Sequence, residues 1–275
     1  MKNILVLGSG TMGSQITFYL ADNEYIVTIY DIDKNNLDNT RGNLNKLISK
    51  GKYSESIYKN INFISDLEGI DLKSVELVIE AVVEKKEVKK KLFKTIEKKL
   101  NAECIITSNS SSIVSSDLIE GLERPGNVCN LHFFNPVHRM NLVEIVKGNH
   151  TTEKTINSLK EFIKEIGKEY VIVEKEIIGF VVNRILASII DEALFLYDEG
   201  YADFKEIDKA VKEGLNHPMG PFELLDYTGI DVNYYIKNLL YQEESDEKRK
   251  PTKSLVNLYE KGDLGVKTGR GYYEY

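Results

Sequence analysis

Short apolar runs alternate with longer stretches of helical periodicity along the first two thirds of the chain. The runs are rich in β-branched residues and bounded by polar or turn-forming residues, which is typical of buried strands. We predict strands at residues 3–7, 26–30, 75–81, 103–108, 128–134, 143–146 and 170–173. Helical patterns between them lie at residues 12–22, 34–50, 85–100 and 153–166. Helices that connect successive strands are the crossovers that parallel strands require, so the pattern predicts an α/β fold with a doubly wound sheet.

The strand pattern stops near residue 180, and helical periodicity continues to the end of the chain. We predict helices at residues 180–199, 204–213, 222–240 and 254–261. A length of 275 residues is about twice that of a usual domain. We therefore predict an α/β domain over residues 1–182 and an all-α domain over residues 183–275, whose large apolar faces would cover a cleft or form a subunit interface.

Composition excludes several classes of protein. The chain is 42% hydrophobic and 29% charged, as in soluble globular proteins, and its formal net charge of −7 disfavours nucleic-acid and anionic-membrane binding. Cys104 and Cys129 are too few for a secreted disulfide framework and lack metal-ligand spacing. We expect both to be reduced and buried, no metal site, and a cytoplasmic protein.

Two apolar stretches test whether the chain carries a targeting or membrane segment. The run at residues 4–7 is too short for the core of a signal peptide. The stretch at residues 177–196 is interrupted by charged and polar side chains, so we expect a buried helix and no membrane span. The interrupting residues are Asn183, Arg184, Asp191 and Glu192.

Residues 8–13 read Gly-Ser-Gly-Thr-Met-Gly, directly after the first strand and at the start of a helix. In a dinucleotide-binding fingerprint, these glycines allow a tight turn, close approach of a pyrophosphate and close packing of helix on strand. We expect cofactor contacts from Gly8, Gly10, Thr11, Met12 and Gly13. The context favours a Rossmann-like domain.

Asp31 ends the second strand, 18 residues after the last glycine of the motif. A carboxylate there can accept hydrogen bonds from the adenosine ribose hydroxyls. Ile32 and Asp33 follow it, so a ribose phosphate would meet repulsion without a cationic partner, and NAD is favoured over NADP. The alternative is a glycine turn with an aspartate that only caps a helix.

His132 lies at the end of a predicted core strand, and Glu144 lies in the next apolar run. Hydride transfer from an alcohol needs a base for the hydroxyl proton, and histidine suits that role near neutral pH. A carboxylate in an apolar run needs a partner, so we expect Glu144 to pair with His132 and to stabilise the imidazolium. Taken alone, the two residues could instead be a core histidine and a solvent-facing glutamate.

A polar cluster, Ser-Asn-Ser-Ser-Ser at residues 108–112, ends the preceding strand, at the edge where open α/β sheets bind ligands. This position favours the catalytic interpretation of His132. Asn183 begins the long apolar helix and could donate to a substrate carbonyl, or it could cap that helix or form an interdomain hydrogen bond.

Together these motifs closely resemble the L-3-hydroxyacyl-CoA dehydrogenase family, essentially from end to end. Besides the segments above, the resemblance includes Glu-Ala-Val-Val-Glu at 80–84, His-Phe-Phe-Asn-Pro at 132–136, Gly-Phe-Val-Val-Asn-Arg at 179–184, Pro-Met-Gly-Pro-Phe-Glu-Leu-Leu-Asp at 218–226 and Lys-Thr-Gly-Arg-Gly-Tyr-Tyr at 267–273.

The resemblance implies a role for each matching residue. His132 matches the catalytic base, Glu144 its partner, and Ser111 and Asn183 the groups that bind the substrate oxygen. The positions matching cofactor contacts are Glu84, Lys89, Ser111, Asn135 and Lys267. For coenzyme A, Lys50 matches a phosphate-contacting lysine on a helix with Arg41 and Lys46, and Asn43 stands where a relative may have serine.

The activity implied is NAD-dependent interconversion of a (3S)-3-hydroxyacyl-CoA and its 3-ketoacyl-CoA. We expect a short-chain substrate such as 3-hydroxybutyryl-CoA, with acetoacetyl-CoA as the product of oxidation, and a homodimer formed through the helical domain. One alternative is a dehydrogenase of free hydroxy acids on the same scaffold. Another is a non-catalytic NAD-binding protein, whose signature would be intact glycines with a broken His–Glu pair.

Overall fold

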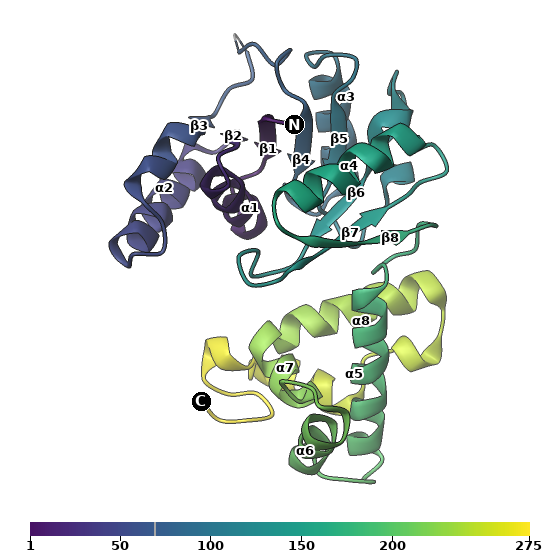
Figure 1. Cartoon of the computed structure of the whole chain (residues 1–275). Helices are drawn as coiled ribbons and strands as arrows, with labels where there is room; N and C mark the ends of the chain where they lie inside the picture. The colour runs from purple at the N-terminus through teal and green to yellow at the C-terminus, as the bar shows by residue number, and fades with distance from the viewer. Residues whose placement is uncertain (69) are drawn as a thin grey trace. The chain divides into compact units, whose positions relative to one another are not determined.

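The computed structural model describes residues 1–68 and 70–275. The chain divides into two compact units, Met1–Phe180 and Val181–Tyr275 (Figure 1). The division falls two residues before the boundary expected from the sequence, because Val181 and Val182 already belong with the first helix of the second unit.

An eight-stranded sheet forms the centre of the first unit, in the order β3-β2-β1-β4-β5-β6-β7-β8. All neighbouring strands are parallel except β6 and β7, which are antiparallel. The sheet is Rossmann-like, and the predicted doubly wound α/β class is confirmed. The strands are β1 (Asn3–Leu7), β2 (Ile26–Tyr30), β3 (Ile61–Ile64), β4 (Leu77–Glu80), β5 (Ile105–Ser108), β6 (Val128–Phe133), β7 (Leu142–Val146) and β8 (Glu169–Val173).

Alternation within β1 explains how helices cover both faces of the sheet. Ile4 and Val6 pack with one core cluster, to which helices α1 (Thr11–Asp22), α2 (Lys34–Ser49) and α4 (Glu153–Glu165) contribute. Leu5 and Leu7 point to the other face and pack with a second cluster that includes residues of α3 (Lys86–Glu97). A central strand with two buried faces reads as a continuous apolar run, as residues 4–7 do.

Strand β3 was not predicted from the sequence. Its four residues, Ile61–Ile64, include an exposed asparagine and follow a 3₁₀ helix at Glu55–Asn60. Such a short edge strand carries too little periodicity to be separated from a loop. The pairing with β2 comes from the tertiary fold.

The second unit is helical, with α5 (Val182–Asp198), α6 (Phe204–Leu215), α7 (Pro221–Thr228), α8 (Ile230–Glu244) and α9 (Lys253–Lys261). The single helix expected over residues 222–240 is wrong: Gly229, with a φ of +106°, separates α7 from α8. Periodicity continues across the break, so the sequence pattern alone did not reveal it.

A buried carboxylate ties the end of the chain to this unit. Asp226 accepts hydrogen bonds from the backbone N–H groups of Tyr272 (2.9 Å) and Tyr273 (2.8 Å). A Cβ at Gly271 would lie 2.0 Å from the Asp226 carboxylate, so only glycine lets the terminal segment approach this closely.

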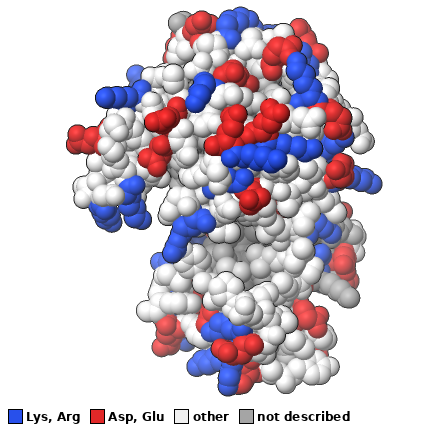
Figure 2. Space-filling model, viewed as in Figure 1, with Lys and Arg blue, Asp and Glu red and all other residues white. Residues whose placement is uncertain are grey.

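No helix among residues 1–68 and 70–275 is long and apolar enough to cross a membrane. Figure 2 shows acidic and basic side chains interspersed over the visible face, without a large area of one sign.

Candidate active site

The glycine-rich loop that connects β1 to α1 contains two glycines that the fold requires and one that faces open space. Gly8 has a φ of +97°, and a Cβ there would lie 2.6 Å from the carbonyl oxygen of Ala81. A Cβ at Gly13 would lie 1.9 Å from the carbonyl oxygen of Gly8, so both glycines are required by the fold. An added Cβ at Gly10 has no described atom within 4 Å, and Gly10 is the N-cap of α1, which begins at Thr11. Open space before a helix N-terminus fits a dinucleotide pyrophosphate.

Asp31 lies beside this loop. Its carboxylate accepts hydrogen bonds from the Ser9 backbone N–H (2.8 Å) and hydroxyl (2.7 Å), and from Asp33 N–H (3.0 Å) and Asn36 Nδ2 (3.3 Å). Burial alone would raise the pKa of Asp31, but these hydrogen bonds outweigh it and lower the pKa. Asp33, not Asp31, caps α2. An anion is therefore held next to the loop, as ribose hydroxyl recognition requires.

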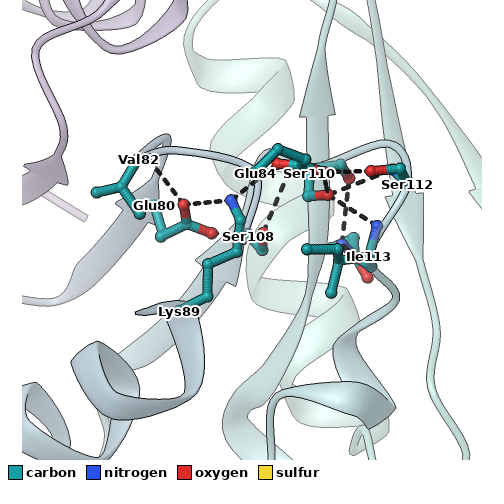
Figure 3. A network of polar contacts seen from close by, with 9 residues as sticks. Glu80, Val82, Glu84, Lys89, Ser108, Ser110, Ser112 and Ile113 are labelled. Atoms are coloured by element: carbon teal, nitrogen blue, oxygen red, sulfur yellow. Dashed lines mark hydrogen bonds and ion pairs between the residues drawn. The ribbon is translucent and has the colours of Figure 1, made fainter. Parts of the chain in front are cut away.

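Figure 3 shows a polar network at the ends of β4 and β5. Lys89 Nζ lies 2.5 Å from Glu80 Oε1 and 3.1 Å from Glu84 Oε2. Glu84 also accepts hydrogen bonds from the hydroxyls of Ser110 and Ser112. Burial would raise the pKa of Glu84, but Lys89 and the two hydroxyls lower it. Glu84 thus carries a stabilised negative charge at the carboxyl edge of the sheet.

His132 and Glu144 face each other across the antiparallel pair β6–β7. His132 Nδ1 lies 2.8 Å from Glu144 Oε2. Glu144 is fully buried, which contradicts the alternative of a solvent-facing glutamate. The rings of Phe134 and Phe180 lie 4.5 and 5.6 Å from the imidazole, centroid to centroid. The sheet register therefore places a carboxylate on one nitrogen of a histidine packed between aromatic rings.

Ser111 and Asn135 lie in the loops that follow β5 and β6. The carbonyl oxygen of Ser111 accepts a hydrogen bond from Gly179 N–H (2.9 Å). Asn135 Oδ1 accepts one from Gln15 Nε2 (3.0 Å), and Gln15 Oε1 accepts one from Val137 N–H (2.9 Å). Gln15 lies on α1, so it connects the cofactor helix to the loop after His132. Sequence reasoning did not single out Gln15, because an amide in a helix gives no sign of its distant partner.

The two residues predicted for coenzyme A lie on or just after α2. Asn43 is exposed in the helix, and Lys50 is its exposed C-cap residue. Arg41 lies on the same helix, nine residues before Lys50, with its guanidinium 4.5 Å from the centre of the Phe63 ring. This end of the first unit therefore presents cationic side chains to solvent.

Two predicted site residues belong to the helical unit. Asn183 is the second residue of α5, and the N-cap is Val181, so Asn183 does not cap the helix. Lys267 forms an ion pair with Asp231.

Neither cysteine takes part in these arrangements. Cys104 and Cys129 are free and buried, as predicted, and burial raises the pKa of each thiol. Among residues 1–68 and 70–275, no group of three or more histidine, cysteine, aspartate or glutamate side chains could hold a metal ion.

Comparison with known proteins identifies the family. Residues 3–177 match the model for the NAD-binding domain of 3-hydroxyacyl-CoA dehydrogenase, and residues 179–275 match the model for its C-terminal domain. A 3-hydroxybutyryl-CoA dehydrogenase of Bradyrhizobium diazoefficiens is 38% identical over 281 residues, which cover 100% of this chain and 96% of that protein.

Solved structures agree with the family models. The (S)-3-hydroxybutyryl-CoA dehydrogenase of Ralstonia eutropha is 36% identical, with a TM-score of 0.89 and coverage of 100% of this chain and 99% of that one. A diketoreductase is 31% identical with the same TM-score and coverage. The chain therefore belongs to the 3-hydroxyacyl-CoA dehydrogenase family, as an oxidoreductase with an NAD-binding domain.

Proposed function

We propose that this protein interconverts a short-chain (3S)-3-hydroxyacyl-CoA and the corresponding 3-ketoacyl-CoA, with 3-hydroxybutyryl-CoA and acetoacetyl-CoA as the pair to test first. The observation that carries the proposal is the buried His132–Glu144 pair, 2.8 Å apart, in the same sheet as the glycine-rich loop. The names of the similar proteins support the choice of substrate.

In this proposal His132 exchanges the proton of the reacting hydroxyl. Bound NAD supplies the acceptor for the hydride that leaves the same carbon. Because Nδ1 faces the carboxylate of Glu144, the proton is taken and returned at Nε2. Glu144 holds the ring in the tautomer that leaves Nε2 as acceptor and stabilises the imidazolium once the proton arrives.

Substrate placement completes the proposed mechanism. Ser111 and Asn183 would hold the reacting oxygen, and Asn43 and Lys50 would contact coenzyme A from α2. The exposed cations Arg41, Lys46 and Lys50 on α2 and at its C-cap match the charge of coenzyme A phosphates. Holding the reacting atoms in register and stabilising charge would supply most of the rate acceleration.

The decisive assay is oxidation of NADH by the purified protein in the presence of acetoacetyl-CoA, with NADPH in parallel. The substitution His132→Asn should reduce the rate by about 10²–10⁴-fold while leaving NADH affinity nearly intact, because it removes only the acid–base group. The substitution His138→Asn is the matched control, since His138 is an exposed histidine six residues further along the chain. The absence of turnover with any 3-ketoacyl-CoA would refute the proposal.

A second candidate is a dehydrogenase of free hydroxy acids or other carbonyl compounds. The similarity to a diketoreductase favours testing it. Activity with a free 3-hydroxy acid and none with its thioester would establish this alternative. Tight NAD binding without turnover of either class would instead support a non-catalytic NAD-binding protein.

We also propose that the protein acts in the cytoplasm as a homodimer and takes part in fatty-acid or butyrate metabolism. The helical unit carries exposed apolar side chains, which support a dimer formed through it; Ile185, Phe195 and Leu215 are each about half exposed or more. Light scattering of the purified protein at micromolar concentration should give the mass of a dimer, and a monomeric mass would contradict this expectation.

A further inference from the structure

Glu80 is a fully buried carboxylate at the carboxyl end of a central strand. It is the last residue of β4, after three apolar residues, and β4 lies between β1 and β5. Buried carboxylates are costly unless they are paired and hydrogen-bonded. Neither the sequence reasoning nor the family comparison assigns Glu80 a role.

The Glu80 carboxylate is satisfied on both oxygens (Figure 3). Oε1 accepts hydrogen bonds from Val82 N–H (2.7 Å) and Lys89 Nζ (2.5 Å), and Oε2 accepts one from the Ser108 hydroxyl (2.6 Å). The Lys89 side chain is only 1% exposed. Lys89 is therefore enclosed in the protein and held by Glu80, with Glu84 as its second carboxylate partner.

The charges of this network do not cancel. It contains two carboxylates, Glu80 and Glu84, and one ammonium group, Lys89, which leaves one net negative charge. Glu80 and Lys89 are both buried, whereas the Glu84 side chain is 46% exposed. The unbalanced charge is therefore presented at the surface of the sheet edge by Glu84.

The position of this charge matters for a bound dinucleotide. The glycine-rich loop follows β1, His132 lies on β6, and β4 and β5 are the two strands between them. A cofactor with its pyrophosphate at the loop and its reactive ring near His132 must cross the ends of β4 and β5, where Glu84 lies. The oxidised nicotinamide ring is cationic and the reduced ring is neutral, so a nearby anion favours the oxidised form.

We propose that Glu80 is a positioning residue that holds Lys89 inside the protein and takes up part of its charge, so that the net negative charge of the network lies at Glu84 beside the nicotinamide and raises the affinity for NAD⁺ relative to that for NADH. This inference rests on the proposed function for the placement of the ring near His132.

The test is the ratio of the dissociation constants of NAD⁺ and NADH, measured by calorimetry and fluorescence on the full chain without any acyl-CoA. In Glu80→Gln only Lys89 and Glu84 remain charged and the network has no net charge, so NAD⁺ affinity should fall about three- to tenfold relative to NADH affinity. Glu84→Gln should move the ratio in the same direction. A purely structural role for Glu80 would weaken both cofactors equally and would overturn the inference.

The double variant Glu80→Gln/Lys89→Met removes both buried charges and keeps the anion of Glu84. Its ratio of NAD⁺ to NADH dissociation constants should return to that of the wild type. This variant can be measured even if Glu80→Gln alone folds poorly, because replacing both buried charges leaves no unpaired charge in the interior. If the double variant keeps the ratio measured for Glu80→Gln, the net charge of the network does not set the ratio, and the inference fails.

Glu97→Gln is the matched control. Glu97 is also a buried carboxylate beside a cation, and it lies on the same helix as Lys89. Its carboxylate accepts hydrogen bonds from Glu123 N–H (3.0 Å) and Arg124 N–H (2.8 Å) and lies 3.6 Å from Arg124 Nε. Its substitution should change stability and leave the ratio unchanged. A wild-type protein that binds both cofactors but turns over no 3-ketoacyl-CoA would refute the proposed function without deciding this inference.

Discussion

Removing the charge of Glu144 while keeping its shape is the sharpest test of the proposed acid–base pair. In Glu144→Gln the side chain can still accept a hydrogen bond from His132 Nδ1–H, so the ring keeps its orientation. The imidazolium formed during oxidation, however, loses its anionic partner. The variant therefore separates charge stabilisation from ring placement.

The size of the effect follows from the geometry. With Nδ1 and Oε2 2.8 Å apart, the two charges are centred about 4 Å apart, and at an effective dielectric constant of about 20 their attraction is about 4 kcal/mol. If most of this is present in the transition state, the barrier rises by about 3–4 kcal/mol. The rate should then fall about 10²–10³-fold.

The assay is formation of NADH from 3-hydroxybutyryl-CoA at saturating NAD⁺. NADH affinity should stay within about twofold of the wild type, because the substitution leaves the cofactor loop unchanged. Glu97→Gln serves again as the control for losing a buried carboxylate. A loss below about tenfold in Glu144→Gln, or an equal loss in Glu97→Gln, would show that the charge of Glu144 does not act in the reaction.

Two further substitutions test the cofactor end. A Cβ added in Gly10→Ala meets no described atom within 4 Å, so this substitution should leave the free energy of unfolding unchanged and weaken NADH binding about tenfold or more. Gly13→Ala instead forces a Cβ to 1.9 Å from the carbonyl oxygen of Gly8 and should destabilise the fold by about 3 kcal/mol. Urea unfolding and NADH titration separate the two, and equal stability losses would contradict the assignment. Burial raises the pKa of Asp31, but its hydrogen bonds lower the pKa by more, so the net pKa in the folded protein is below the ordinary value of 3.8. The ionised Asp31 carboxylate therefore stabilises the fold at pH values above 3.8, and this stabilisation is lost as the pH falls through the lowered pKa. Asp31→Asn should therefore be less stable than the wild type at neutral pH, with the two unfolding midpoints converging in acid; a constant difference would refute this.

The sequence predicted the parts of the site that depend on strand ends and local motifs. His132 and Glu144 each stood out because a polar residue occupied an apolar run, and a buried carboxylate needs a partner. The glycine motif was readable because its turn, strand and helix are contiguous in the chain. The glycine motif and the two polar residues in apolar runs are each recognisable from a few neighbouring residues, and few functions suit a buried histidine or a buried carboxylate.

The parts that escaped prediction depend on distant partners. Glu80 gave the same signal as Glu144, an acidic residue ending an apolar run, but its cation lies nine residues further along in a lysine-rich helix that reads as a solvated face. The Gln15–Asn135 hydrogen bond joins residues 120 positions apart. The break at Gly229 depends on a backbone angle that periodicity does not encode.

The one antiparallel pairing of the described sheet has a consequence for how the acid–base pair is assembled. Because His132 and Glu144 are direct partners in a β-hairpin, both groups lie within one contiguous segment, twelve positions apart in the chain. Their relative placement is a matter of short-range pairing and needs neither cofactor nor substrate to form. Insertions between the two strands can lengthen the connecting loop without disturbing the pair, whereas a one-residue slip in either strand would turn one partner to the opposite face of the sheet.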